Sequence, residues 1–345
     1  MYDLLVFIGR FQPFHNQHKR VIDEALTQAK NVLVLVGSSG GPRTPKNPWT
    51  YEERSNMILQ DYPVGTNLYT DALVDFPYDD GAWAHQVREA IKFVALDIAN
   101  PDGFRNHGIA DLKIGIIGTR KDESSYYLDM FPQYDLVEVE LTSPLNATTI
   151  RESLFRDLFM PVSLLPWATV AVLDEMPEDF WADMTEWQEA IDDNADAWAT
   201  APYPVKQVTV DAVVRYQDQI LLVRRGSHPG KGLLALPGGH LNVGERTLAG
   251  ALRELREETG LVIEPSLFNL QIKSFIADHP GRSTMGHTIS HCFQFDISWK
   301  AERPEVEGAD DAVSAGWVNI SDLREDNMFD DHYHIIKELV KVRGW

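Results

Sequence analysis

The sequence predicts an α/β protein with two domains, a doubly wound parallel sheet followed by an α+β domain. The 345 residues exceed what a single core ordinarily holds. In the first part of the chain short apolar runs alternate with helical patterns, which favours parallel strands joined by crossover helices. After the prolines near residue 204 the pattern changes to paired strands around one strong helix. We therefore expect a first domain over residues 1–165, an acidic helical linker over 166–204 and a second domain over 205–345.

The elements of the first domain follow from apolar runs and helical spacing. Buried strands are predicted at residues 4–8, 31–36 and 113–117. Helices are predicted at residues 21–29, 52–60 and 83–99. Ligands of such sheets bind at the carboxyl ends of strands, where helices begin, so we expect a site in the loop after the first strand.

The second domain combines strand patterns with a single helix. Strands are predicted at residues 208–214, 220–223, 270–276 and 291–297. The first two lie on either side of Gln217-Asp218, as in a hairpin. A glycine-rich loop and the helix come between the second and third of these strands, which predicts a mixed α+β arrangement.

The segment between the domains is acidic, with no Lys or Arg between Asp157 and Val205. Its apolar residues Phe180, Met184, Trp187 and Ile191 recur at helical spacing. They indicate either an amphipathic helix packed on a domain face and followed by a proline-stiffened linker, or a helix that binds a partner. We favour the packed helix.

The formal net charge is -21, from 31 Lys and Arg against 52 Asp and Glu. Such a surface repels phosphate backbones and anionic lipids, so we expect neither nucleic acid nor a membrane as a partner. Small anionic substrates bind only where local cations or metal ions reverse the field. No apolar run reaches membrane-spanning length, and Met1-Tyr2-Asp3 lacks the basic start of a signal peptide, which predicts a cytoplasmic protein.

The chain has one cysteine, Cys292. A single cysteine excludes an intramolecular disulfide and a multi-cysteine metal site. We interpret it as a small buried apolar side chain rather than a nucleophile. Nothing in the sequence decides the oligomeric state, so a homo-oligomer stays open.

The loop from Gly9 to His18 joins the first predicted strand to the first helix and carries two histidines. Pro13 disfavours helix before it, so His15 and His18 are expected at or just inside the helix start. Free backbone N–H groups there favour an anion, and two imidazoles three residues apart share one face. Arg10 adds a permanent, fork-shaped donor for phosphate oxygens. Two histidines at this spacing have two interpretations, a structural pair or a phosphate site, and a second cluster favours the phosphate site.

A second cluster, residues 146–151, places hydroxyl groups before a predicted helix whose first turn carries Arg151. Thr148 has two interpretations: it caps this helix, or it binds a phosphate together with Arg151. Trp49 and Trp83 are equally open, since each side chain either contacts an aromatic base or packs in a core.

Residues 9–18 resemble the signature of the nucleotidylyltransferase superfamily, in the form found in archaeal-type nicotinamide mononucleotide (NMN) adenylyltransferases. Residues 47–54 resemble the second motif of that family, and residues 148–151 resemble its carboxyl-side phosphate motif. The resemblance implies that His15 and His18 hold the ATP phosphates. It implies nucleotide-binding or catalytic roles for Gly9, Arg10, Phe11, His15, His18, Trp49, Arg54, Trp83, Thr148 and Arg151. Arg54 and Arg151 would bind phosphates, and Trp83 would stack on nicotinamide.

Two positions depart from that family, since Gln17 stands where glycine is usual and Ala147 where serine is more common. The implied reaction is attack by the NMN phosphate oxygen on the α-phosphorus of ATP, which gives NAD and releases pyrophosphate. No protein nucleophile is needed. Positioning and stabilisation of charge on the phosphate oxygens carry the rate, with Mg²⁺ sharing the work.

The predicted helix of the second domain carries three glutamates on one face, Glu254, Glu257 and Glu258. Three carboxylates in one place repel unless cations join them, and hard oxygen ligands select Mg²⁺ or Mn²⁺. Arg253 is placed to pair with Glu257 one turn on. The alternative is a solvated acidic face, but the glycine-rich loop directly before the helix favours a site.

Residues 239–261 match the Nudix box at every defining position. The resemblance implies metal-dependent hydrolysis of a nucleoside diphosphate linked to another group. It implies metal ligands at Gly239, Glu254, Glu257 and Glu258, with Glu257 and Glu258 also catalytic. Glu245 and Arg253 would support the metal ligands.

Residues 280–291 and 310–312 resemble ADP-ribose pyrophosphatases, which implies a nucleotide-binding role for Arg282. Met285 and His287 replace arginines usual in that pattern. The two domains in this order resemble bifunctional NMN adenylyltransferase/ADP-ribose pyrophosphatases. The implied substrates and products include ATP, NMN, NAD and ADP-ribose, and the implied cofactor is Mg²⁺ or Mn²⁺.

Two other functions fit parts of the sequence. One is a different adenylyl or cytidylyl transferase fused to a broad Nudix hydrolase. The other is a regulator whose Nudix-like domain senses an NAD metabolite. A regulator would need a basic DNA-reading element, and the acidic tail after Ser321 lacks one.

Overall fold

The computed structural model describes residues 1–100, 108–120, 123–140, 143, 145–264, 272–309 and 312–341. The chain divides into two compact units, Met1–Thr185 and Glu186–Trp345. Within the described ranges, no helix combines the length and the apolar character needed to cross a membrane.

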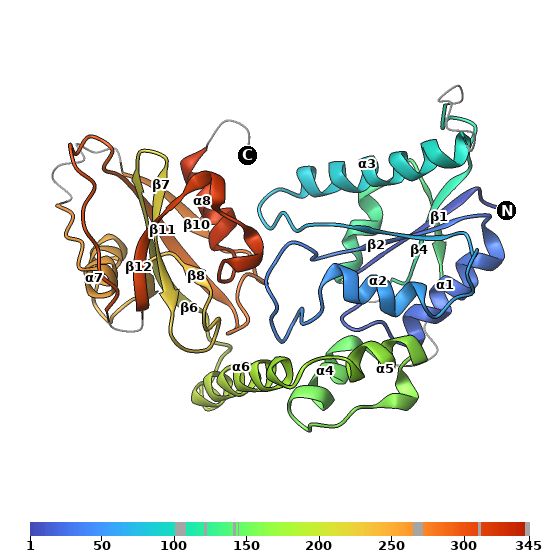
Figure 1. Ribbon diagram of the computed structural model, residues 1–345, viewed down its shortest axis with the longest axis horizontal. Coiled ribbons are helices and arrows are strands. Elements are labelled where there is room, and N and C mark those ends of the chain that lie inside the picture. Colours follow the sequence, from blue (N-terminus) through green and yellow to red (C-terminus); the bar gives the residue numbers. More distant parts are fainter. Residues whose placement is uncertain are drawn as a thin grey trace. The chain divides into compact units, whose positions relative to one another are not determined.

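The first unit contains a five-stranded parallel sheet in the order β3-β2-β1-β4-β5 (Figure 1). The strands are β1 (Leu4–Gly9), β2 (Val32–Val36), β3 (Leu68–Ala72), β4 (Ile114–Gly118) and β5 (Asp135–Glu138). This confirms the doubly wound sheet, and β1, β2 and β4 confirm the three predicted strands. The two edge strands escaped the sequence analysis because they are only partly buried and carry polar residues. The strand order reverses between β1 and β4, the place where such sheets bind ligands.

Helices cover both faces of this sheet (Figure 1). They are α1 (Asn16–Gln28), α2 (Tyr51–Leu59), α3 (Asp80–Ala99), α4 (Ala147–Phe155) and α5 (Trp167–Asp174), with short 3₁₀ turns η1 (Glu123–Met130) and η2 (Val162–Leu164). Helix α3 packs Val87 and Ile91, four residues apart, into the core cluster that also contains Leu33 and Leu35 of β2. Helix α2 begins with a capping box, in which Thr50 and Glu53 exchange hydrogen bonds between side chain and backbone. These local rules place α1 and α2 at the carboxyl ends of β1 and β2.

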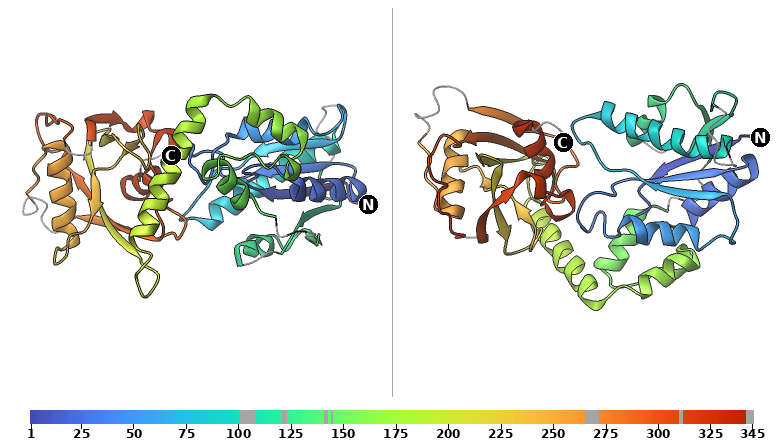
Figure 2. Two further views of the ribbon diagram at one scale, coloured as in Figure 1. Left: turned by 90° about the horizontal axis from the view of Figure 1, so that it is seen from below. Right: turned by 45° about the horizontal axis from the view of Figure 1, so that its top comes forward.

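The second unit contains a mixed sheet in the order β10-β11-β6-β7-β12, with β8 beside β7 and β9 beside β6. The strands are β6 (Gln207–Tyr216), β7 (Gln219–Arg225), β8 (Leu234–Ala235), β9 (Gly238–His240), β10 (Lys273–Ala277), β11 (Thr288–Asp296) and β12 (Ala312–Asn319). The helices are α7 (Thr247–Thr259) and α8 (His332–Val340), with turns η4 (Ile320–Asp322) and η5 (Glu325–Asn327). Figures 1 and 2 show α7 and α8 on opposite sides of the strands of this unit. The hairpin at Gln217-Asp218 and the mixed α+β arrangement are confirmed.

The segment that the sequence assigned to a linker is divided between the units. Helix α5 and the first residues of α6 (Glu178–Ala197) belong to the first unit, and the rest of α6 belongs to the second. The reason is packing: the Phe180 ring contacts Trp49, whereas the Trp187 indole donates a hydrogen bond to Thr284. The amphipathic helix is confirmed, but its two ends contact different units.

Candidate active sites

The loop after β1 carries His15 and His18 to the start of α1, as the sequence predicted. His15 is the residue before the helix, and His18 lies in its first turn. Their rings stack with centroids 3.6 Å apart and planes 18° apart. His15 is only 4% exposed. The stack fixes both imidazoles at the helix N-terminus, where backbone N–H groups favour an anion.

A cavity of about 210 Å³ opens beside these histidines and joins the two predicted phosphate motifs. The residues singled out from the sequence that line it are Arg10, Phe11, His15, His18, Thr148 and Arg151. Gln17, at a position that departs from the family, also lines the cavity. So does Thr119, which the sequence analysis missed although it follows the carboxyl end of β4.

Arg151 reaches the cavity from α4 and is held in place by two hydrogen bonds. Its guanidinium donates to the Gln12 carbonyl at 2.6 Å and to Thr148 Oγ1 at 3.3 Å. The cap of α4 is Asn146, whose side chain accepts from the Thr149 N–H, so the capping interpretation of Thr148 is wrong. The Thr148 hydroxyl instead lies at the cavity, in contact with Arg151.

The cavity is electropositive although the whole chain is acidic. Burial lowers the pKa of Arg151 to about 10, and the nearby Arg10 acts in the same direction. Burial also lowers the pKa of Arg10. Both guanidiniums remain charged at neutral pH, and an anion between two desolvated cations stabilises both.

Arg54 lies outside this cavity lining and is fully buried. Its side chain donates hydrogen bonds to the carbonyl oxygens of Thr50, Arg10, Gly37 and Ser38 and to the Ser39 hydroxyl. Those acceptors belong to the start of α2 and to the loops after β1 and β2. The structure therefore shows Arg54 holding loops together, with its donors directed at backbone oxygens.

The two tryptophans also lie outside the lining of the cavity. Trp49 is 1% exposed and its ring contacts Phe155 and Phe180. Trp83 is partly buried and packs its ring against Tyr127 and Phe131. Gly9 faces the ring of Phe11, and a Cβ added at Gly9 would come within 2.9 Å of that ring.

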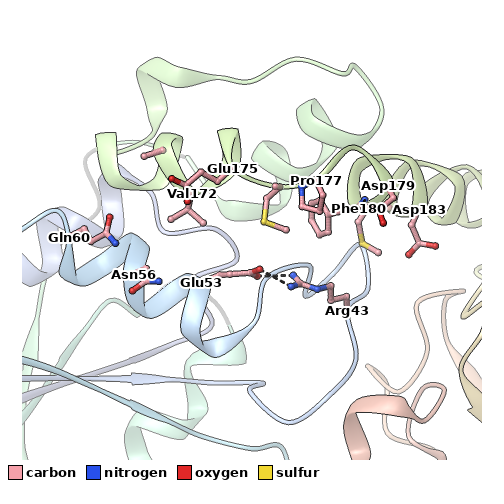
Figure 3. Close-up of a pocket in the computed structure, with 13 residues that line it drawn as sticks. Arg43, Glu53, Asn56, Gln60, Val172, Glu175, Pro177, Asp179, Phe180 and Asp183 are labelled. Carbon is pink, nitrogen blue, oxygen red and sulfur yellow. Dashed lines mark hydrogen bonds and ion pairs between the residues drawn. The ribbon is translucent and has the colours of Figure 1, made fainter.

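A larger hollow of about 670 Å³ lies elsewhere in the first unit, between α2 and the segment from α5 to the start of α6 (Figure 3). Arg43 and Glu53 form a two-point ion pair in its wall, with both N–O distances 2.7 Å. Its other ionisable lining residues are acidic: Glu175, Asp179 and Asp183. A phosphate would be repelled by this wall, so charge, and not volume, favours the smaller cavity as the candidate anion site.

In the second unit, α7 carries the three glutamates together with Arg253. The Arg253 guanidinium donates to Glu245 at 2.9 and 3.0 Å, to Glu254 at 2.8 Å and to Glu257 at 2.9 Å. Gly260 ends the helix in the left-handed conformation at φ 69°, which favours glycine. This network fixes the direction of the carboxylates.

Glu258 and Glu254 lie at the buried side of the cluster. Burial raises the pKa of Glu258 to about 8, with a further contribution from Glu254, and burial raises the pKa of Glu254. Glu258 accepts a hydrogen bond from the Gly238 N–H at 3.0 Å. A Cβ added at Gly239 would come within 2.6 Å of the Glu254 carboxylate, so only glycine lets this loop approach the helix.

The donor set of this cluster fits a hard divalent cation. Carboxylate oxygens and the Gly239 carbonyl are the ligands that Mg²⁺ and Mn²⁺ prefer, and a bound cation reverses the rise of the glutamate pKa values. In the described part of the chain no three acidic, imidazole or thiol side chains already stand at metal-binding spacing. The Arg253 guanidinium instead bridges Glu254 and Glu257.

Arg282 does not point its guanidinium at solvent. It forms a two-point ion pair with Asp331 at 2.7 and 3.0 Å, and its side chain is 3% exposed. The acidic pair at residues 310 and 311 lies outside the described residues. Arg225, which the sequence analysis missed, lines a small cavity together with Glu258 and stacks on the Phe329 ring at 4.2 Å.

Comparison with known proteins assigns both units. A NUDIX domain family model matches residues 205–339, and a cytidylyltransferase-like family model matches residues 6–66. A nicotinamide/nicotinic acid mononucleotide adenylyltransferase of Acinetobacter baylyi is 36% identical over 50% of this chain and 85% of its own length. An ADP-ribose pyrophosphatase of Methanocaldococcus jannaschii is 33% identical over 40% of this chain and 75% of its own length.

A solved structure matches the whole chain. It is a bifunctional NMN adenylyltransferase/ADP ribose pyrophosphatase of Francisella tularensis, complexed with AMP and a manganese ion. The match has a TM-score of 0.88 at 32% identity and covers 99% of both chains. A second structure of a bifunctional NMN adenylyltransferase/ADP ribose pyrophosphatase from Francisella tularensis matches with a TM-score of 0.89.

Proposed function

We propose that the two units of this chain perform two separate reactions of NAD metabolism. The chain belongs to the bifunctional NMN adenylyltransferase/ADP-ribose pyrophosphatase family. The first transfers the adenylyl group of ATP to NMN and gives NAD and pyrophosphate. The second hydrolyses ADP-ribose to AMP and ribose 5-phosphate. Each reaction uses the charged residues of its own unit.

The observation that supports the first reaction is the convergence of Arg10, His15, His18 and Arg151 on one cavity. In the proposed reaction an oxygen of the NMN phosphate attacks the α-phosphorus of ATP, and the bond to pyrophosphate breaks. The imidazoles and guanidiniums bind the leaving pyrophosphate and stabilise the negative charge that develops on it. Because these donors already lie together, the site needs little reorganisation.

Arg54 enters this proposal as a positioning residue. It holds the Arg10 carbonyl at 2.5 Å and the Gly37 carbonyl at 2.6 Å, which joins the loops after β1 and β2. Trp49 belongs to the packed core beside them, whereas the partly buried Trp83 keeps its proposed role in stacking on nicotinamide.

The observation that supports the second reaction is the cluster of three glutamates on α7, two of which, Glu254 and Glu258, have their pKa raised chiefly by burial and favour a bound cation. Glu254, Glu257, Glu258 and the Gly239 carbonyl would hold Mg²⁺ or Mn²⁺. Such an ion, when bound, neutralises pyrophosphate charge and makes water more acidic. Arg253 and Glu245 orient the carboxylates through the hydrogen bonds described above.

ADP-ribose is the proposed substrate of the second site. Arg282, for which the resemblance implies a nucleotide-binding role, is held in an ion pair with Asp331 and is not exposed. Met285 and His287 stand where related enzymes have arginines, so the selectivity for ADP-ribose over other nucleoside diphosphate derivatives is the property to measure. The proposal includes a cytoplasmic location, no nucleic-acid partner and a homo-oligomer as one candidate assembly.

Product chromatography with the purified full-length chain tests both reactions. One arm contains NMN and ATP with Mg²⁺, and the expected products are NAD and pyrophosphate. A parallel arm replaces ATP with CTP and is expected to give no dinucleotide. The other arm contains ADP-ribose with Mg²⁺ or Mn²⁺, and the expected products are AMP and ribose 5-phosphate.

Each alternative has its own signature in that experiment. Transfer from CTP but not from ATP would replace the first assignment with a cytidylyl transferase. Binding of ADP-ribose without hydrolysis would replace the second with a metabolite sensor. Comparable hydrolysis of several nucleoside diphosphate derivatives would indicate a broad Nudix hydrolase.

A further inference from the structure

Two buried residues outside the recognised motifs contact the loop that carries Gly239. Asp211 lies in the middle of β6, and His332 is the first residue of α8. Their exposed fractions are 5% and 6%. Both side chains are almost closed to solvent, so any effect on hydrolysis acts through the groups that they contact.

His332 accepts a hydrogen bond from the loop backbone. The Leu236 N–H donates to His332 Nδ1 at 2.9 Å, in a buried setting. Burial lowers the pKa of His332 to about 3, so the ring is neutral and Nδ1 keeps its lone pair for this bond. The proton is then on Nε2, which faces Asp211 Oδ1 at 3.7 Å.

Asp211 supports the next part of the same loop. It stands opposite Gly238 in the β6–β9 pairing, and its carboxylate fills the space that a side chain at position 238 would need. The Ser290 hydroxyl donates to Asp211 Oδ2, and the Cys292 thiol lies 3.7 Å from the same oxygen. Strand β11 thereby holds the carboxylate against the loop.

The loop transmits this support to the glutamate cluster. Leu236 is three residues before Gly239, and Gly238 between them donates its N–H to Glu258 at 3.0 Å. Gly239 in turn packs directly against Glu254. A shift of the Leu236 backbone therefore changes the position of a proposed metal ligand and of two glutamates together.

We propose that His332 and Asp211 are positioning residues that set the place of the Leu236–Gly239 loop and thereby the affinity of the glutamate cluster for a divalent cation. This inference rests on the proposed hydrolase function of the second unit. It extends the catalytic apparatus to α8, which contributes no residue to the Nudix motif.

An isosteric pair of variants tests the role of His332. In His332→Asn the side-chain oxygen takes the place of Nδ1 and accepts from Leu236, whereas His332→Leu has a similar size and no acceptor. We expect His332→Leu to weaken Mn²⁺ binding about 10- to 100-fold, the usual loss for a supporting residue, and His332→Asn to stay within about threefold. Mn²⁺ affinity is measured by electron paramagnetic resonance on the full chain without substrate. The measurement is made at a temperature below that at which each variant unfolds.

NAD formation by the same samples is the control and should be unchanged in both variants. Equal Mn²⁺ affinity of His332→Leu and the unmodified chain would overturn the inference and leave the proposed hydrolase intact. If the unmodified chain binds no Mn²⁺ that Glu254→Gln removes, the proposed hydrolase and the inference both fail.

A second pair decides the matter if His332→Leu does not fold. Asp211→Asn keeps the volume under Gly238 and an oxygen that accepts from Ser290, whereas Asp211→Ala removes both. Asp211→Ala should bind Mn²⁺ at least about tenfold more weakly than Asp211→Asn. Equal affinities of these two variants would also overturn the inference.

Discussion

The candidate sites of the two units carry side chains of opposite charge, although the proposed substrates of both contain a pyrophosphate group. In the first unit Arg10 and Arg151 line the cavity beside two histidines at a helix start. In the second unit three glutamates gather on α7, and the cation in contact with two of them is Arg253. In the proposed function, the first site supplies its own cations for the phosphate oxygens, whereas the second depends on a bound metal ion.

Burial prepares both sites in the same way. It lowers the pKa of Arg151 to about 10 and raises the pKa of Glu258 to about 8, and in each case the charged form is disfavoured until a partner of opposite charge arrives. In the proposed function, that partner is the nucleotide at the first site and a divalent cation at the second. The two sites should therefore differ most in their dependence on metal.

Removal of divalent metal ions should give the largest separation between the two activities. Chelation should lower ADP-ribose hydrolysis roughly a thousandfold or more, because a bound cation supplies several kcal/mol of charge stabilisation. NAD formation should fall by a smaller factor, since the protein's own cations remain. Initial rates of both reactions, before chelation, after it and after addition of Mg²⁺ or Mn²⁺, check this. An equal or larger loss of NAD formation would show that the first site depends on metal as much as the second.

His18→Ala should lower the turnover of NMN and ATP by two to three orders of magnitude, about the loss expected for one preorganised donor. Hydrolysis of ADP-ribose should survive and serves as the control for folding. The variant also examines Gln17, which lines the same cavity in place of the usual glycine. If Gln17 marks a decayed site, the unmodified chain will form no NAD and His18→Ala will change nothing. A time course of NAD formation with both proteins distinguishes these outcomes.

Glu257→Gln is the matching change in the second unit. It removes one anionic ligand while keeping the size of a side chain that accepts from Arg253 at 2.9 Å. ADP-ribose hydrolysis should fall at least about a hundredfold, and NAD formation should stay nearly unchanged. Rates of both reactions in one preparation provide the measurement. Loss of both activities in a folded variant would show that the sites are not separate.

The placement of both sites follows from sequence patterns. Apolar runs predicted β1, β2 and β4, and the rule that ligands bind at strand ends predicted a site at residues 9–18. Arg151 of the motif at residues 148–151 contacts that loop, as expected for two motifs that form one site. These features depend on local periodicity and on residue type, which a sequence displays directly.

The sequence could not show which acceptors the N–H groups of an arginine bind. Arg54 and Arg282 have the residue type and spacing of phosphate ligands, yet Arg54 binds loop carbonyls and Arg282 binds Asp331. Those acceptors come from segments distant in the chain, which only the fold brings together. The cap of α4 escaped prediction for a related reason: Asn146 and Thr148 are both good capping residues, and a shift of two residues in the helix start decides between them.

Arg54→Lys tests whether this arginine holds loops rather than phosphates. A lysine cannot reach five acceptors, and losing charge-assisted hydrogen bonds of about 1.5–3 kcal/mol each should lower NAD formation about tenfold. The first unit should also unfold at a lower temperature without any nucleotide. Differential scanning calorimetry of the nucleotide-free chain provides that measurement. If Arg54 only bound phosphate, the substitution would leave this unfolding temperature unchanged. That result would indicate that Arg54 is a phosphate-binding residue.

Substitution of Trp83 should have the smallest effect on activity. It tests whether the first site extends beyond the phosphate cavity to the Trp83 ring. The ring packs on Tyr127 and Phe131 and is only partly buried, so part of it is available to a ligand. Stacking on nicotinamide contributes about 1 kcal/mol, so Trp83→Leu should raise the KM for NMN roughly fivefold. Trp83→Phe keeps an aromatic face and should raise it less, and the KM for ATP should be unchanged in both. If both variants lower the thermal stability and leave the KM for NMN unchanged, Trp83 is a core residue and nicotinamide is bound elsewhere.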